Sequence, residues 1–178
     1  VTASGTTGTF ATKQVGTGKT VTLSGTTYGG ADAGNYTFTD QASTTAAITP
    51  KAATVSGLTA ANKVYDGTTT ATVAHSGASF SGLVAGDTVT ASGTTGTFAT
   101  KQVGTGKTVT LSGTTYGGAD AGNYTFTDQA STTAAITAKA ATLSGLTAAD
   151  KVYDGTTSAT VAHSGASFSG LVAGDTVT

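Results

Sequence analysis

The sequence contains no cysteine, methionine, tryptophan, arginine or glutamate, and its only proline is Pro50. Without cysteine the chain can form neither a disulfide framework nor a thiolate site, and this absence fits an exported protein that avoids thiols. Charged residues make up 10% of the chain, against roughly 25% in typical soluble domains. The eight lysines and nine aspartates nearly balance. This balance provides no basic patch for nucleic acid and no polybasic surface for a membrane, and no apolar run approaches the roughly 18 residues of a membrane span.

What the sequence does contain is an internal repeat of 88 residues, because residues 1–90 reappear almost unchanged as residues 89–178. This period is too long for a solenoid repeat of roughly 20–50 residues, and it suits a whole small domain. The chain does not begin with methionine, so we expect it to be an internal piece of a longer protein. The substituted pairs are Pro50/Ala138, Val55/Leu143, Asn62/Asp150 and Thr70/Ser158.

Short runs in the sequence alternate apolar residues with threonine. Val109 and Leu111 would face one side of a strand, while Thr108 and Thr110 face the other. A period of two is typical of a half-buried antiparallel strand, and clusters such as Gly104-Thr-Gly106 are expected to be turns between strands. The pattern predicts an all-β protein built of antiparallel sandwiches, with almost no helix. The motifs described below imply that these are tandem immunoglobulin-like sandwiches in a rod-like array. The expected strands include residues 53–59, 70–74, 87–92, 107–112, 123–127 and 132–137.

The natural reading frame of the repeat does not coincide with the ends of the chain. We expect residues 51–138 to be a complete repeat (the central repeat), because a strand ends before Pro50 and a new run opens at Lys51. Residues 1–50 (the first segment) would then be the C-terminal part of a preceding repeat, and residues 139–178 (the last segment) the N-terminal part of a following one. Such incomplete sandwiches expose unpaired edges, which favours head-to-tail self-association. The core residues expected in the central repeat are Val109, Leu111, Tyr124, Phe126 and Ile136.

One motif resembles the entrance to strand F of immunoglobulin domains. The spacing Asp-x-Gly-x-Tyr-x-hydrophobe occurs from Asp32 to Tyr36 and Phe38, and again from Asp120 to Tyr124 and Phe126. In those domains the tyrosine hydroxyl bonds to an upstream backbone group, an arrangement known as the tyrosine corner. We therefore predict structural roles for Asp32, Tyr36, Asp120 and Tyr124.

The motif series as a whole resembles the YDG-type, immunoglobulin-like repeats of bacterial proteins. It runs through Lys63–Thr68, Leu83–Val89, Lys101–Lys107, Asn123-Tyr124 and Ala135–Thr137, and so covers the whole period. Repeats of this kind occur in tandem arrays of very large secreted surface adhesins, including filamentous-haemagglutinin-like and biofilm-matrix proteins. The resemblance implies a β-sandwich stalk module that is secreted or on the bacterial cell surface, and it implies no catalytic residues.

The Tyr-Asp-Gly triplets could line a ligand pocket, but Asp-Gly is first of all a turn signal. We therefore predict a structural turn at each triplet, one formed by Tyr65, Asp66 and Gly67 and the other by Tyr153, Asp154 and Gly155. Tyr28 and Tyr116, each beside a Gly-Gly pair, are the best candidates for contact with a ligand.

No residue pattern predicts catalysis, a cofactor or a metal. His75 and His163 have no second histidine or cysteine nearby for zinc, and no nucleophile elbow surrounds the serines. The aspartates are scattered rather than grouped for calcium, although a site at a domain junction stays open. The sequence thus predicts a non-enzymatic stalk or spacer repeat that contacts identical neighbouring repeats and extends a distal binding domain. The alternatives are a repeat that itself binds a glycan or protein, or one that self-associates into extracellular fibres or biofilm matrix.

Overall fold

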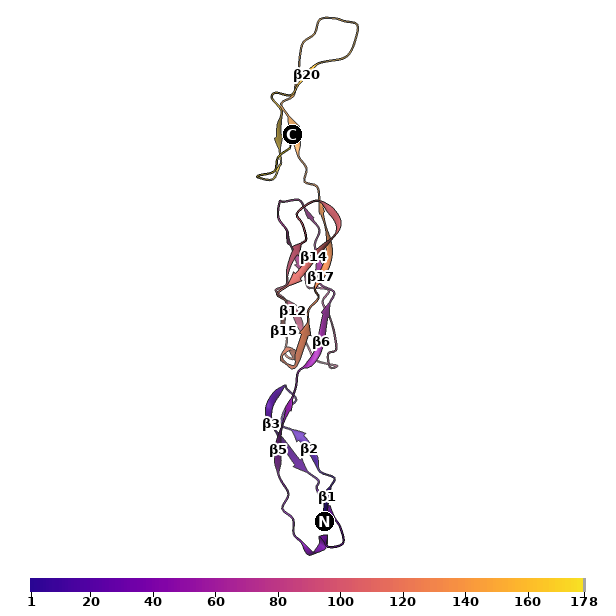
Figure 1. The fold of residues 1–178 in the computed structure, drawn as a ribbon, viewed down its shortest axis with the longest axis vertical. Helices are drawn as coiled ribbons and strands as arrows, with labels where there is room; N and C mark the ends of the chain where they lie inside the picture. Colours follow the sequence, from indigo (N-terminus) through magenta and orange to yellow (C-terminus); the bar gives the residue numbers. More distant parts are fainter. Residues whose placement is uncertain (178) are drawn as a thin grey trace. The chain divides into compact units, whose positions relative to one another are not determined.

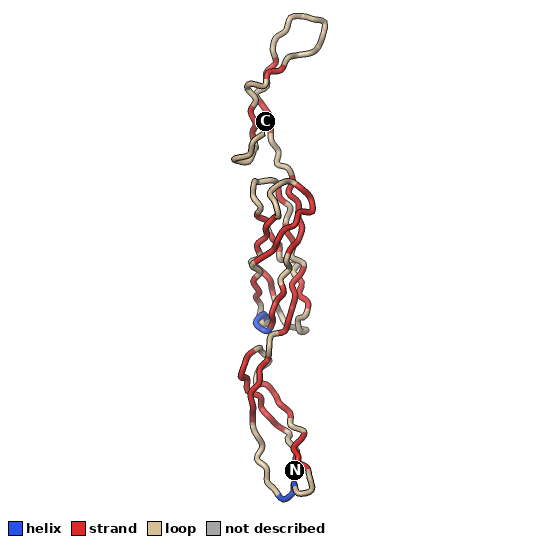
Figure 2. Tube along the Cα trace, viewed as in Figure 1, coloured by secondary structure: helices blue, strands red, loops and turns tan. Residues whose placement is uncertain are grey.

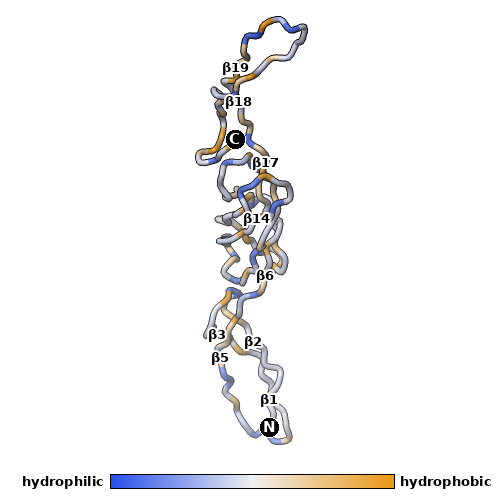
Figure 3. The backbone as a smooth tube through the Cα atoms, turned by 45° about the horizontal axis from the view of Figure 1, so that its top comes forward, coloured by the Kyte–Doolittle hydropathy of each residue, from blue (hydrophilic) through white to orange (hydrophobic). Residues whose placement is uncertain are grey.

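The computed structural model describes residues 1–177 as an all-β chain (Figure 1). Within these residues the helical elements are two single 3-10 turns, η1 (Ala33–Asn35) and η2 (Ala121–Asn123), drawn blue in Figure 2. The all-β prediction is therefore confirmed. None of the helices in the described part of the chain has the length and apolarity that a membrane crossing needs. Apolar positions occur as short stretches along the chain (Figure 3).

The described residues form two compact units, and each unit draws strands from the central repeat and from one flanking segment. Unit 1 contains the whole first segment, and unit 2 contains the described part of the last segment, whose final residue lies outside the description. Unit 1 comprises Val1–Gly57, Ala78–Gly93 and Thr114–Gln129; unit 2 comprises Leu58–Gly77, Thr94–Gly113 and the residues from Ala130 onward.

The first segment contributes two antiparallel sheets to unit 1. One pairs β1 (Thr2–Ser4) with β4 (Thr27–Gly29), and the other has the order β2-β3-β5. Val21 of β3 is buried, as expected for an apolar position in an alternating strand. The bounds of the three-stranded sheet are β2 (Thr7–Phe10), β3 (Gly16–Ser24) and β5 (Ser43–Ile48).

The central repeat contributes the rest of unit 1. β6 (Lys51–Ser56) lies between β11 (Ser79–Ser81) and β16 (Tyr124–Thr127), and β12 (Thr90–Ser92) pairs with β15 (Thr115–Gly117). An aromatic cluster joins these two sheets: the Phe126 ring stacks on the Tyr116 ring at 3.9 Å, and Phe80 meets both rings edge-on.

Unit 2 is built around a five-stranded sheet of the order β8-β17-β14-β13-β9, with a separate pair formed by β7 and β10. Its apolar residues alternate along β14 and β17, so that Val109, Leu111 and Ile136 are buried. The bounds are β7 (Thr59–Ala60), β8 (Lys63–Val64), β9 (Thr70–Ala71), β10 (Val73–Ala74), β13 (Thr95–Phe98), β14 (Gly104–Ser112) and β17 (Ser131–Thr137).

The expected core of the central repeat is largely confirmed. Val109, Leu111 and Ile136 are buried in unit 2 and Tyr124 is buried in unit 1, while Phe126 is half-buried. The structure adds members that the alternation did not single out, of which the largest fully buried ones are Phe98, Leu58 and Val55.

The last segment forms two short antiparallel pairs in unit 2. β18 (Thr142–Ser144) pairs with β21 (Ser167–Ser169), and β19 (Thr147–Ala148) pairs with β20 (Val161–Ala162).

The expectation of purely antiparallel sheets is wrong for two strand pairs. β16 runs parallel to β6, with Phe126 opposite Ala53, and β17 runs parallel to β8, with Ile136 opposite Lys63. Both pairs join the beginning of the repeat to its end. Alternation of side chains reports which face of a strand is buried, but it carries no information on the direction of the neighbouring strand.

Two local expectations also need correction. Gly104-Thr-Gly106 is not a turn but an irregularity within β14, where the register shifts between Gly104 and Lys107. Gly106 has φ +58°, a conformation that glycine adopts without the strain of a side chain. The strand expected over residues 53–59 is divided into β6 and β7 by Gly57, and the strand expected over 70–74 is divided into β9 and β10.

Candidate functional site

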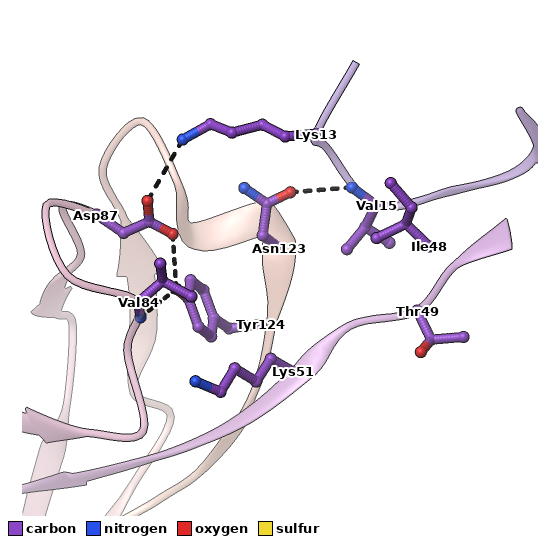
Figure 4. Close-up of a pocket in the computed structure, with 9 residues that line it drawn as sticks. All are labelled: Lys13, Val15, Ile48, Thr49, Lys51, Val84, Asp87, Asn123 and Tyr124. Atoms are coloured by element: carbon purple, nitrogen blue, oxygen red, sulfur yellow. Dashed lines mark hydrogen bonds and ion pairs between the residues drawn. The ribbon is translucent and has the colours of Figure 1, made fainter. Parts of the chain in front are cut away.

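A polar site in unit 1 lies where the first segment meets the central repeat. A cavity of about 250 Å³ opens there, with Lys13 and Asn123 directed toward groups of the opposite segment (Figure 4). We call this place the first junction. The residues that line it are Lys13, Val15, Ile48, Thr49, Lys51, Val84, Asp87, Asn123 and Tyr124.

Tyr124 anchors the central-repeat side of the first junction. Its hydroxyl accepts a hydrogen bond from the Val84 N–H at 2.9 Å and donates one to Asp87 Oδ2 at 2.6 Å. The hydrogen bond to the Asp87 carboxylate is the main reason why the pKa of Tyr124 is raised. The bonded backbone group lies 40 residues upstream, so the hydroxyl holds the loop before β12 rather than the residues just before the tyrosine.

The first segment reaches this site through a lysine and a backbone amide. Lys13 Nζ lies 3.5 Å from Asp87 Oδ1 and 3.9 Å from Asp120 Oδ1, and the Val15 N–H donates to Asn123 Oδ1 at 3.0 Å. The Asp120 side chain also accepts from the Thr88 N–H at 2.9 Å, which ties η2 to the same loop. One loop of the central repeat is therefore held by its own repeat and by the segment before it.

The equivalent positions in the first segment are arranged differently. The Tyr36 side chain is exposed and its ring lies 6.2 Å from that of Phe38. The turn at Asp32 is nevertheless like that at Asp120, since neither aspartate caps its 3-10 turn with its side chain, and the Asp32 carbonyl accepts from the Asn35 N–H at 3.1 Å.

The Tyr-Asp-Gly triplet of the central repeat forms a compact turn. Asp66 Oδ1 accepts from Lys63 Nζ at 2.8 Å and from the N–H of Thr68 at 2.9 Å. The hydrogen bond from Lys63 contributes most to lowering the pKa of Asp66 to about 2, and the Thr68 amide adds to it. Gly67 has φ +80°, which favours glycine over residues with a side chain.

The last segment repeats this turn with nearly the same contacts. Asp154 Oδ1 accepts from Lys151 Nζ at 2.8 Å and from the Thr156 N–H at 2.9 Å, and Gly155 has φ +74°. The Tyr153 side chain, however, is 93% exposed. The turn therefore forms whether or not its tyrosine is covered.

Tyr65 takes part in a second junction, which lies within unit 2. Its hydroxyl donates to Asp175 Oδ1 at 3.2 Å, and its backbone N–H bonds to the Thr137 carbonyl at 2.8 Å. A cavity of about 130 Å³ lies beside this contact. It is lined by Tyr65, Val103, Ala138, Lys139, Ala141, Gly170, Leu171, Val172 and Asp175.

The two candidate ligand tyrosines are engaged in local packing. The Tyr116 ring stacks on Phe126 and its hydroxyl donates to Asp128. Burial contributes most to raising the pKa of Tyr116, and the hydrogen bond to Asp128 contributes next. Tyr28 stacks on Phe38 at 3.8 Å, and its hydroxyl donates to Asp40 at 2.5 Å. That hydrogen bond raises the pKa of Tyr28.

The His75 side chain contacts a threonine rather than a group of possible metal ligands. Its Nε2 lies 3.0 Å from Thr94 Oγ1, within unit 2. Across residues 1–177 no three histidine, cysteine, aspartate or glutamate side chains gather as ligands of a single ion.

Sequence reasoning identified Tyr65, Tyr124 and Asp120, but it missed the groups that they meet. Asp87, Asp175 and Lys13 belong to glycine-bordered loops, and only the fold brings them to the junctions. The sequence signal that could have found this loop is Val84, because a turn that faces only solvent has no use for a large apolar side chain in its middle.

Comparison with known proteins gives one result that covers nearly the whole chain. The YDG domain family matches residues 1–46, 49–134 and 137–178. No curated protein and no solved structure shows a significant match. Because the family covers all three parts of the sequence, this chain belongs to the YDG domain family.

Proposed function

We propose that this chain is a non-enzymatic stretch of structural repeats from the stalk of a large bacterial cell-surface or secreted adhesin. Each repeat would fold as an immunoglobulin-like sandwich and add its own length to a rod-like array that carries a distal binding domain. The support is the tandem 88-residue repeat, the match to the YDG domain in three successive ranges, and the resemblance of the motif series to adhesin repeats.

The observation that carries the proposal is that both junctions are held by side-chain contacts. The first has the Lys13–Asp87 ion pair and the bond from the Val15 N–H to Asn123, and the second has the bond from Tyr65 to Asp175. A flexible linker would lack such contacts, and successive domains would then be free to reorient. Repeated contacts of this kind favour a connection that resists bending, as a spacer requires.

Small-angle scattering on chains of one to four repeats tests this function. A stalk predicts that the radius of gyration grows by nearly the same increment with each added repeat. Freely jointed repeats would instead grow roughly as the square root of their number. A glycan array probed with the same chains tests the binding alternative; specific retention of a single repeat would contradict a pure spacer.

Self-association is a second candidate function, because both flanking segments expose apolar residues whose equivalents are more deeply buried in the central repeat. Residues 139–178 correspond to residues 51–90, and residues 1–50 correspond to 89–138, so the last segment of one molecule and the first segment of another together make one repeat. The exposed residues are Tyr36, Phe38, Leu143, Leu146 and Phe168.

Sedimentation analysis separates the two candidates. Head-to-tail association predicts that the 178-residue chain forms concentration-dependent oligomers while residues 51–138 alone stay monomeric. A monodisperse monomer of the longer chain at high concentration would rule out this association.

A further inference from the structure

The two junctions show the same loop in two different surroundings. The loop Gly82–Asp87 and the loop Gly170–Asp175 have the same sequence, 88 residues apart. The first loop meets Lys13 from the preceding segment and Tyr124 from its own repeat. The second loop meets Tyr65 from the preceding repeat. The given sequence contains no residue 88 positions before Tyr65 and none 88 positions after Tyr124, so each junction has only one of the two tyrosines.

The exposure of the loop valine differs between the two junctions. Val84 is 51% exposed, whereas Val172 is half-buried. The residue beside Val172 is Gly67: a Cβ built on Gly67 would lie 2.9 Å from Val172 Cγ1. The glycine thus leaves room for the valine, and the turn covers apolar surface that is exposed where the turn is missing.

The two carboxylate oxygens of the loop aspartate have enough acceptor positions for all three partners. Asp87 Oδ2 accepts from the Tyr124 hydroxyl, while Asp87 Oδ1 faces Lys13. Asp175 uses its Oδ1 for Tyr65. An ionised carboxylate has about four acceptor positions, so one aspartate can accept from both tyrosines and the lysine at once.

We propose that the Tyr-Asp-Gly turn of each repeat is the docking element for the Gly-Leu-Val-Ala-Gly-Asp loop of the next repeat. In a complete junction the tyrosine bonds to the loop aspartate, the glycine admits the loop valine, and the tyrosine equivalent to Tyr124 holds the same aspartate from the other side. The partner is a second copy of this repeat. The proposal rests on the proposed function in one respect, since it assumes a continuous array.

The turn is suited to this role because it is formed before it docks. The contacts of Asp66 with Lys63 and Thr68 recur around Asp154, although Tyr153 has its side chain in solvent. A surface that is already ordered loses little conformational entropy on binding.

Amide hydrogen exchange on the 178-residue chain tests the proposal with matched variants. Y65F removes the bond to Asp175, and Y153F makes the same change at an exposed tyrosine. We expect Y65F to raise exchange about fivefold at the amides of residues 171–175, including the Asp175 N–H that bonds to the Val172 carbonyl. Y153F should leave these amides unchanged, and residues 82–87 serve as an internal reference. Equal exchange in the two variants would overturn the docking role.

A glycine pair tests the apolar half of the contact. G67A and G155A place alanine at closely similar positive φ values, but among the described residues no atom beyond the chain neighbours lies within 4 Å of a Cβ on Gly155. G67A should therefore raise exchange in residues 171–175, whereas G155A should not. No difference between them would show that the turn does not pack on Val172.

The outcomes distinguish this inference from the stalk function. If Y65F releases the loop but arrays do not lengthen linearly, docking stands and the stalk function fails. If arrays lengthen linearly while Y65F and Y153F behave alike, the stalk function stands and the docking role fails.

Discussion

Asp120–Phe126 and Asp32–Phe38 have the same residues in different surroundings. Both begin with a 3-10 turn, but only residues 124–127 continue as a strand, β16, which pairs with β6. Residues 36–39, although described by the structure, are not assigned to a strand, and Tyr36 is 63% exposed against 7% for Tyr124. The sequence given has no copy of β6 before the first segment. A strand at this position thus depends on its partner rather than on its own residues.

The last segment shows the same dependence at the other end of the repeat. Leu58 is 1% exposed in the central repeat, whereas Leu146, at the equivalent position, is 41% exposed. Residues 63–64 form β8 against β17, but the described residues 151–152 are not assigned to a strand. The first and last thirds of the repeat therefore stabilise each other.

The largest expected effect comes from truncating the buried leucine. L58A should destabilise the chain by about 2–5 kcal/mol, because it removes a fully buried side chain and leaves a cavity. L146A makes the same change at an exposed position and should cost about 1 kcal/mol or less. Urea unfolding of both variants measures the difference, and equal midpoints would contradict the comparison.

A glycine in β13 offers the next test. A Cβ on Gly96 would lie within 3.2 Å of three side chains, those of Val73, Val109 and Ala71. A Cβ on Gly8 in the first segment would meet one side chain as closely, Val21 at 2.8 Å, and Leu23 only at 3.6 Å. G96A should cost about 1–3 kcal/mol through overpacking. G8A should cost less, because β2 has no counterpart of β9 and β10 beside it. A larger loss of stability for G8A than for G96A would disprove this account.

The tyrosine pair gives a smaller effect. Y124F removes a hydroxyl that joins Val84 and Asp87, so we expect a loss of about 1–2 kcal/mol. Y36F alters a side chain that is mostly in solvent and should change stability by less than about 0.5 kcal/mol. If thermal unfolding of Y124F matches that of Y36F, the hydroxyl does not stabilise the loop.

The Asp-Gly turns should show the smallest contrast between the segments. Folding lowers the pKa of Asp66 to about 2 and also lowers that of Asp154. The contribution of each turn to stability is therefore fully present above the unfolded value of about 3.9, and it is lost as the pH falls through the lower folded pKa. NMR titration should show both carboxyl groups titrating low. Lys63→Met should raise only the pKa of Asp66, and Lys151→Met only that of Asp154; a rise of both in either variant would show that the turns are not local.

The fold could be predicted from sequence where the signal is periodic. Alternation correctly identified Val109, Leu111 and Ile136 as buried, and the strand over residues 132–137 is close to β17. Leu58 was missed as a core residue because it follows Gly57 between two strands, where no alternation marks it. Asp87 was missed because its partners Lys13 and Tyr124 are distant in sequence, and no local pattern connects them.

The sequence by itself determines the all-β character, the repeat and the Asp-Gly turns. The turns form alike in both copies because their hydrogen bonds join residues only two to five positions apart. The tertiary structure alone decides which tyrosines are buried, which runs become strands, and that β6 pairs in parallel with β16 and β8 with β17. The physical reason is that a strand completes its backbone hydrogen bonds only against a partner, and here that partner comes from the opposite end of the repeat.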